Sequence, residues 1–104
     1  MIIQINHGDI KKSDSLEEHV REQINERLGY LAERLTRIEV HLRDDSSPTK
    51  HTPGDKRCTM EARPAGMQPL VVEHHGDDFY KVIPETVDKL ERVVKKRMDK
   101  LAER

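Results

Sequence analysis

Apolar residues change from a helical spacing to an alternating one and back again, and this pattern limits the possible folds more than any other feature. The first helical series predicts one long amphipathic helix. Its members are Leu16, Val20, Ile24, Leu28, Leu31 and Leu35. A second series near the C-terminus predicts another helix and consists of Ile83, Val87, Leu90, Val94, Met98 and Leu101. Both stripes need an apolar surface to cover them.

The segments outside these two series have the character of β-strands. In "RIEVHLRD" (37–44), Ile38, Val40 and Leu42 point to one side and polar residues to the other, as in a strand buried on one face. "RCTMEAR" (57–63) alternates too, and "MIIQIN" (1–6) and "LVVEHH" (70–75) are short apolar runs. The predicted order is β-α-β-β-β-α, which favours an α+β two-layer sandwich: a four-stranded sheet with two helices packed on one face.

The helix boundaries allow alternatives. Ser13 and Ser15 can each cap the first helix, and Asp77 or Asp78 can cap the second. Proline is harmless only at the start of a helix, and Pro84 lies beyond the first helical turn. Either the second helix begins later than the aspartates suggest, or it opens with a distorted turn.

The chain length and one polar segment predict the domain organisation. A chain of 104 residues suits a single domain spanning residues 1–104. Residues 44–56 carry prolines, a glycine and few apolar side chains, so we expect a flexible loop, most mobile from Ser46 to Gly54. The predicted core consists of Leu16, Ile24, Leu31, Val40, Leu42, Ile83, Leu90 and Val94.

Several classes of protein are disfavoured. No segment approaches the ~18 apolar residues of a membrane span, and "MIIQINHGD" is unlike a signal peptide, so we expect a cytoplasmic protein with no membrane partner. The single cysteine, Cys58, alternates with Met60 and Ala62, which predicts a buried, inert thiol. Adjacent residues His74 and His75 point to opposite faces of a strand and do not predict a metal site. Since catalytic motifs are also absent, we expect no enzyme, cofactor or small-molecule substrate.

Charge is distributed unevenly along the chain. Residues 79–104 hold eight Lys/Arg and five Asp/Glu, a balance of +3. The other 78 residues hold 11 and 15, a balance of −4. Lys89, Arg92, Lys96 and Lys100, called the cation row below, recur three, four and four residues apart on one side of the predicted helix. Such a row either keeps the helix soluble or contacts a polyanion.

The last helix resembles a known signature. "DDFYKVIPETVDKLERVVKK" is similar to the last helix of the ribosome hibernation-promoting factors, also called sigma-54 modulation or ribosome-associated inhibitor proteins. The matching positions are Asp78, Tyr80, Ile83, Asp88, Lys89, Leu90, Arg92 and Lys96. The "SD" helix opening at Ser13 and "RIEVHL" match more loosely, and β-α-β-β-β-α is the family's order. The chain ends at Arg104 and so resembles the short forms, which implies a separate factor for pairing ribosomes, or no pairing.

The resemblance implies a protein that binds the small ribosomal subunit in the channel used by messenger and transfer RNA and silences idle ribosomes. The partner would be ribosomal RNA, a polyanion that Lys and Arg bind by releasing counterions. Few aromatic residues are available to stack on bases, so recognition by shape and charge is expected. The candidate RNA-binding residues are Lys81, Lys89, Arg92, Lys95, Lys96 and Lys100.

Two alternatives remain open. One is a nucleic-acid-binding module unrelated to ribosomes; the other is a protein–protein adaptor that docks through the acidic first helix. Glu85 lies four residues before Lys89, and Glu91 four before Lys95, so ion pairs within the helix are expected to occupy some of these cations.

Overall fold

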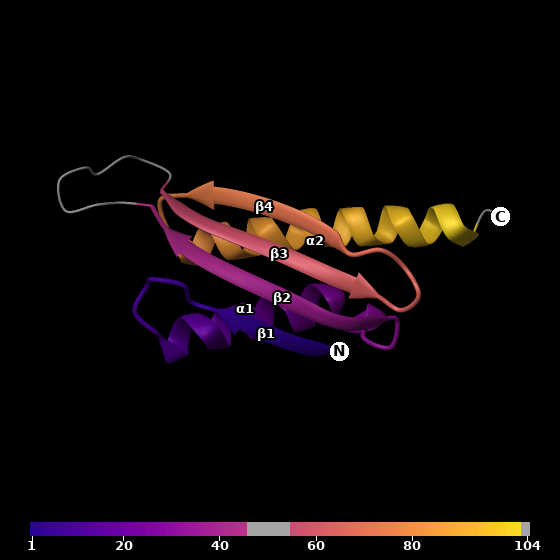
Figure 1. The fold of residues 1–104 in the computed structure, drawn as a ribbon, viewed down its shortest axis with the longest axis horizontal. Coiled ribbons are helices and arrows are strands. Elements are labelled where there is room, and N and C mark those ends of the chain that lie inside the picture. Colours follow the sequence, from indigo (N-terminus) through magenta and orange to yellow (C-terminus); the bar gives the residue numbers. More distant parts are fainter. Residues whose placement is uncertain (46–54, 103–104) are drawn as a thin grey trace.

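The computed structural model describes residues 1–45 and 55–102 (Figure 1). The elements are β1 (Ile2–Asn6), α1 (Asp14–Leu28), the 3-10 turn η1 (Gly29–Leu31), β2 (Leu35–Asp44), β3 (Lys56–Pro64), β4 (Leu70–Gly76) and α2 (Phe79–Ala102). This order confirms the predicted succession of strands and helices. No helix within these ranges is both long and apolar enough to cross a membrane.

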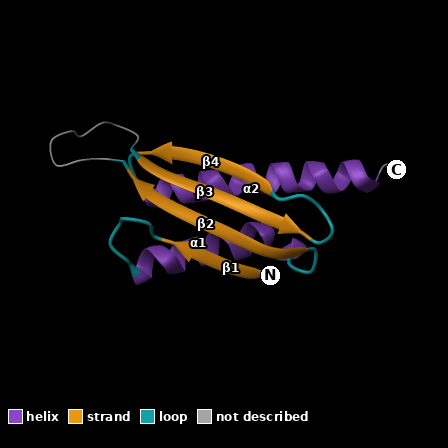
Figure 2. Ribbon diagram, viewed as in Figure 1, coloured by secondary structure: helices purple, strands orange, loops and turns teal. Residues whose placement is uncertain are grey.

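The four strands form one mixed sheet in the order β1-β2-β3-β4. β1 runs parallel to β2, and the β2–β3 and β3–β4 pairs are antiparallel. A parallel pair needs a long crossover connection, which α1 provides. Both helices lie on the same face of the sheet, so the predicted two-layer α+β sandwich is confirmed (Figure 2).

The core lies between the sheet and the two helices. All eight predicted core residues belong to one buried cluster, including Leu31 at 7% exposure and Leu90 at 0%. The strand alternation is also confirmed, since Ile38, Val40 and Leu42 are buried on the same face as Cys58 and Met60. Burying these side chains is the main favourable contribution to folding, at about 25 cal/mol for each Å² of apolar surface.

The first helix is shorter than predicted. Ser13 caps it, with its Oγ accepting a hydrogen bond from the backbone N–H of Leu16 at 3.3 Å. The helix ends at Leu28, and the N–H of Gly29 closes the last turn on the carbonyl of Asn25. Leu35, predicted as helical, is the first residue of β2. The prediction was wrong because a leucine buried in a following turn or strand can fall at the spacing expected for the next buried position of a helix.

The second helix begins directly after Asp78. The Asp78 carboxylate accepts a hydrogen bond from the N–H of Tyr80 at 2.9 Å. The Asp78 carbonyl accepts from both Lys81 and Val82, at 3.0 and 2.9 Å, so the first turn is tightened. α2 then continues through Pro84. A later start of this helix is therefore excluded.

The predicted loop at 44–56 is bounded by paired strand residues. Asp44 ends β2, Lys56 begins β3, and the two are register partners whose side chains form an ion pair at 2.6 Å. The hydrogen bond to Asp44 raises the pKa of Lys56. Asp45 N–H donates to the Asp55 carbonyl at 2.9 Å. The two end residues of the predicted loop, Asp44 and Lys56, therefore belong to strands. The segment from Ser46 to Gly54, which we expected to be mobile, lies outside the described residues.

The C-terminal part of α2 projects beyond the sheet. In Figure 1 the yellow end of the helix continues past the turn that joins β3 to β4. Leu101, predicted to share the buried stripe, is 40% exposed, whereas Met98 is 5% exposed. The stripe therefore loses its cover near the end of the helix. We call residues 95–102 the α2 tip.

Candidate nucleic-acid interface

The six predicted RNA-binding side chains all lie on α2 and are all exposed. They are Lys81, Lys89, Arg92, Lys95, Lys96 and Lys100. The opposite side of α2 is buried against the sheet and against α1, which holds the helix in place. The sequence pattern thus located the outer face of α2 correctly. The contacts of each cation decide whether it is available to a ligand.

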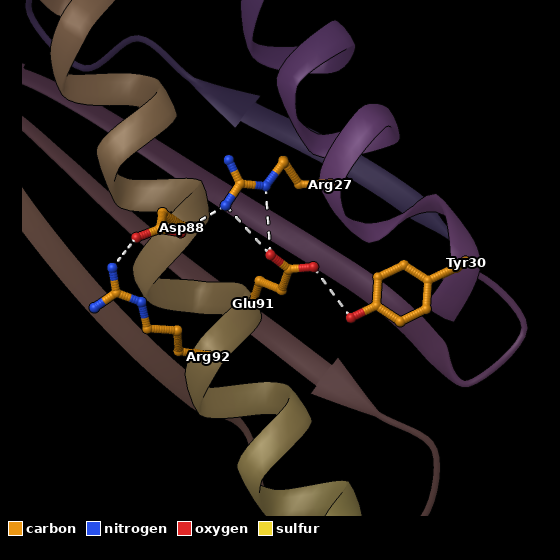
Figure 3. A network of polar contacts seen from close by, with 5 residues as sticks. All are labelled: Arg27, Tyr30, Asp88, Glu91 and Arg92. Atoms are coloured by element: carbon orange, nitrogen blue, oxygen red, sulfur yellow. Dashed lines mark hydrogen bonds and ion pairs between the residues drawn. The ribbon is translucent and has the colours of Figure 1, made fainter.

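The seam between α1 and α2 carries a polar network (Figure 3). Arg27 of α1 donates to Asp88 at 2.5 Å and to Glu91 at 3.3 Å. Tyr30 Oη donates to the other oxygen of Glu91 at 3.1 Å. These contacts raise the pKa of Arg27, chiefly through the hydrogen bond to Asp88. Asp88 also pairs with Arg92. Two of the carboxylates of α2 are therefore engaged by a cation from the acidic helix.

The two ion pairs expected within α2 do not form. Glu91 points toward α1, where it pairs with Arg27 instead of Lys95. Glu85 pairs with His74 of β4, across the helix–sheet interface. Lys89 donates its Nζ to the backbone carbonyl of Glu73 at 3.0 Å. Both pairs were predicted from spacing alone, and tertiary contacts override them.

These contacts divide the cations of α2 into those with an intramolecular partner and those without one. Within residues 1–45 and 55–102, Lys81, Lys95, Lys96 and Lys100 have no hydrogen bond or ion pair, whereas Lys89 and Arg92 do. A hollow of about 500 Å³ is lined by Arg92, Lys95, Lys96, Asp99 and Lys100. Lys95, Lys96 and Lys100 therefore form a surface suited to a polyanion near the C-terminal end of α2, whereas Lys81 lies apart from them at its beginning.

Arg97 is an exposed cation of α2 that is not among the six predicted RNA-binding residues. Its side chain is exposed, although it lies seven residues after the fully buried Leu90 and hence on the apolar side of the helix. A cation at such a position was itself a signal, since arginine is almost never buried unpaired. It indicates that the core no longer covers the side of α2 on which Arg97 lies, although Met98 beside it is still buried.

The open face of the sheet is charged but internally neutralised. Arg37 pairs with Glu39 at 2.7 Å, and Arg63 with Glu61 at 3.3 Å. Arg43 and Arg57 pair with Asp45 at 2.6 and 3.4 Å. Because each arginine already faces a carboxylate, this face is less suited to phosphate groups than α2.

The described residues include other reactive side chains, among them a buried cysteine and two adjacent histidines. Cys58 is fully buried, as predicted, and burial raises its pKa to about 12. The rings of His74 and His75 have centroids 6.4 Å apart. Across the described part of the chain, no three His, Cys, Asp or Glu side chains come together as metal ligands.

The outer side of α1 has the opposite character to α2. A shallow hollow of about 570 Å³ lies along this helix and is bordered by five carboxylates and two cations. The residues that line it are Lys12, Asp14, Glu17, Glu18, Arg21, Glu22, Asn25 and Glu26. The helical layer therefore has an acidic half and a basic half, which meet at Arg27, Asp88 and Glu91.

Comparison with known proteins identifies the class to which this fold and this basic helix belong. The model of the family described as "Sigma 54 modulation protein / S30EA ribosomal protein" matches residues 3–102. The chain therefore belongs to this family, as the resemblance of its last helix predicted. Membership supports an association with ribosomes. No curated protein matches the chain.

Solved structures that share the fold include a protein from Coxiella burnetii and one from Thermus thermophilus. A ribosomal subunit interface protein from Coxiella burnetii superposes with a TM-score of 0.78 at 18% identity, covering 95% of this chain and 99% of that one. The N-terminal domain of Protein Y from Thermus thermophilus gives a TM-score of 0.70 at 24% identity, covering 92% and 98%. At these identities the likeness concerns the fold.

Proposed function

We propose that this protein binds the small ribosomal subunit through the cations of α2 and thereby keeps idle ribosomes silent. The partner is ribosomal RNA, contacted mainly through its phosphates. We place the protein in the cytoplasm, where ribosomes are found, and assign it no catalytic activity. Family membership and the name of the Coxiella burnetii neighbour, a ribosomal subunit interface protein, support this proposal.

The observation that carries the proposal is the separation of charge on α2. The carboxylates Glu85, Asp88 and Glu91 are engaged by residues of β4 and α1. Lys95, Lys96 and Lys100 form no ion pair with any described residue, although Asp99 lines the same hollow. Folding does not require lysines at exposed helix positions, where substitutions change stability by about 0.5 kcal/mol or less. A polyanionic ligand gives these positions a role.

The test uses the three lysines that have no intramolecular partner. The variant Lys95→Glu, Lys96→Glu, Lys100→Glu should fold normally and lose binding to isolated small subunits in a co-sedimentation assay. Large subunits and an unrelated structured RNA are run in parallel, because binding to all three would indicate a general nucleic-acid-binding module. In a translation extract, the wild-type protein should lower protein synthesis and the variant should not.

Two controls accompany this variant. Lys11→Glu with Lys12→Glu makes the same kind of charge change outside α2 and should retain most binding. Glu18→Lys with Glu22→Lys reverses charge on α1 and should not weaken it. If the α2 variant binds like the wild type while the α1 variant loses binding, the lysines of α2 are only solvated and the adaptor function through α1 is correct.

A further inference from the structure

Part of the inner side of the α2 tip is exposed, although Met98 within it is only 5% exposed. Leu90, Val94, Arg97 and Leu101 follow at intervals of four, three and four, so they lie on one line along the helix. Leu90 and Val94 are 0% exposed, whereas Leu101 is 40% exposed and Arg97 is also exposed. This line of side chains therefore leaves the core between Val94 and Arg97, whereas Met98 beside it is still buried.

Cations surround this part of the helix. Between residues 92 and 100 there are five Lys/Arg and one acidic residue, Asp99. Lys95, Lys96 and Arg97 are consecutive, so their side chains spread over about 200° of the helix circumference. None of these three has a hydrogen bond or ion pair with a described residue. Positive charge thus covers both the outer and the inner side of the tip.

Two separate hollows flank the tip. The outer hollow, of about 500 Å³, lies among the side chains from Arg92 to Lys100 described above. The inner one, of about 340 Å³, is lined by Met67, Gln68, Arg97, Lys100 and Leu101. Met67 and Gln68 belong to the turn between β3 and β4, so this turn closes one side of the inner hollow. Lys100 borders both hollows.

A polyanion that lay against one side of α2 would leave the cations of the other side in water. We propose that the α2 tip enters a cleft between two RNA backbone segments, with Lys95 and Lys96 facing one segment and Arg97 facing the other. An α-helix with its side chains is about 10–12 Å wide, so the two RNA backbone segments must lie at least this far apart. This inference rests on the proposed function and specifies its ligand as two strands rather than one.

The first experiment compares single neutral replacements in binding to small subunits at a series of salt concentrations. Lys96→Gln removes an outer cation, Arg97→Gln an inner one, and Lys12→Gln an exposed cation outside α2. Each phosphate contact contributes about 0.7 to 0.9 to the log–log salt slope. We expect this loss for Lys96→Gln and Arg97→Gln, the sum of both losses for the double variant, and none for Lys12→Gln.

The second experiment locates the RNA on each side. Iron–EDTA is tethered to Lys96→Cys or Arg97→Cys, and hydroxyl-radical cleavage of the ribosomal RNA is mapped in the bound small subunit. The buried Cys58 takes up no tether, so the wild-type protein serves as the blank. We expect the strongest cuts from the two positions in different RNA segments.

Each outcome decides between the two claims. If Arg97→Gln behaves like Lys12→Gln while Lys96→Gln weakens binding, the cleft is wrong and the proposed function stands. Cuts from both positions in a single RNA segment overturn the cleft in the same way. A loss of affinity for Arg97→Gln without a change in salt slope, and without cuts from position 97, assigns the inner side to a protein contact. A wild-type chain that does not bind subunits removes both claims.

Discussion

His19 Nε2 lies 3.2 Å from the backbone carbonyl oxygen of Tyr80. In a regular helix this oxygen accepts the N–H of the residue four positions later, which here is Pro84. Proline has no N–H, so the helix leaves this acceptor without its usual donor. His19 of α1 donates in its place and therefore carries its proton on Nε2. α1 thus compensates for the proline that α2 contains.

A double-mutant cycle measures this compensation. His19→Ala should lower the free energy of unfolding by about 1 kcal/mol through the lost hydrogen bond, in addition to the loss of ring contact with Tyr80. In a Pro84→Ala background the new N–H pairs with Tyr80, so His19→Ala should cost about 1 kcal/mol less. Urea denaturation of the four proteins gives the coupling. A cost of His19→Ala that is the same in both backgrounds would show that the histidine does not replace the missing donor.

The Arg27 network yields a second prediction, on binding. Arg27→Gln leaves Asp88 and Glu91 without their cation from α1, so these carboxylates should offset the nearby positive charge of α2. We expect weaker binding to small subunits and a lower urea midpoint. Adding Asp88→Asn and Glu91→Gln to this variant should restore binding, although not the hydrogen bonds of Figure 3. If binding stays low in the triple variant, Arg27 contacts the RNA itself.

The sequence predicted the fold well because the fold follows from burial. Alternation in 37–44 and 57–63 and the stripe from Ile83 to Met98 each identify a buried side, and one sheet face serves them all. The errors occurred at Leu35 and Leu101. Helical spacing does not show whether the next leucine still belongs to the helix, as Leu35 does not, or whether the sheet still covers it, as it does not cover Leu101. Both depend on where the sheet begins and ends.

The candidate site was only partly predictable. Exposure of the six cations follows from the helical period, but their availability depends on tertiary contacts. Glu91 turned to Arg27 and Glu85 to His74, residues more than ten positions away, and no local pattern contains these pairs. The same holds for Lys89, whose acceptor is a carbonyl of β4. Spacing along one helix predicts neighbours on that helix and not those supplied by the rest of the fold.

A third prediction concerns Cys58. Burial raises its pKa from 9.0 to about 12. Between pH 9 and about 12 the unfolded chain loses the thiol proton and the folded chain retains it. The contribution of the buried neutral thiol to the free energy of unfolding is therefore fully present below pH 9 and falls as the pH rises toward 12. Relative to Cys58→Ala, the wild-type protein should lose about 2 to 3 kcal/mol of stability by about pH 11.

Thiol labelling provides an independent measurement for Cys58. A disulfide reagent at about pH 8 should modify the denatured chain rapidly and the native chain only at the rate of unfolding, because the thiolate is the reactive form. Rapid labelling of the native protein would mean that β3 opens locally and that the pKa of the folded state is not what limits reactivity.

The last prediction separates two lysines of the cation row. Lys96 lies seven residues after Lys89, on the same side of α2, so sequence spacing treats them as equivalent. The structure distinguishes them, because Lys89 Nζ donates to the Glu73 carbonyl at 3.0 Å and Lys96 has no partner among the described residues. Lys96→Gln should therefore reduce the salt slope of subunit binding by about 0.7 to 0.9, and Lys89→Gln by less than half of that. Co-sedimentation over a potassium chloride series measures both slopes, with Lys12→Gln as the reference. Equal reductions would show that Lys89 leaves β4 for the RNA, which would make its bond to Glu73 a contact of the free protein only.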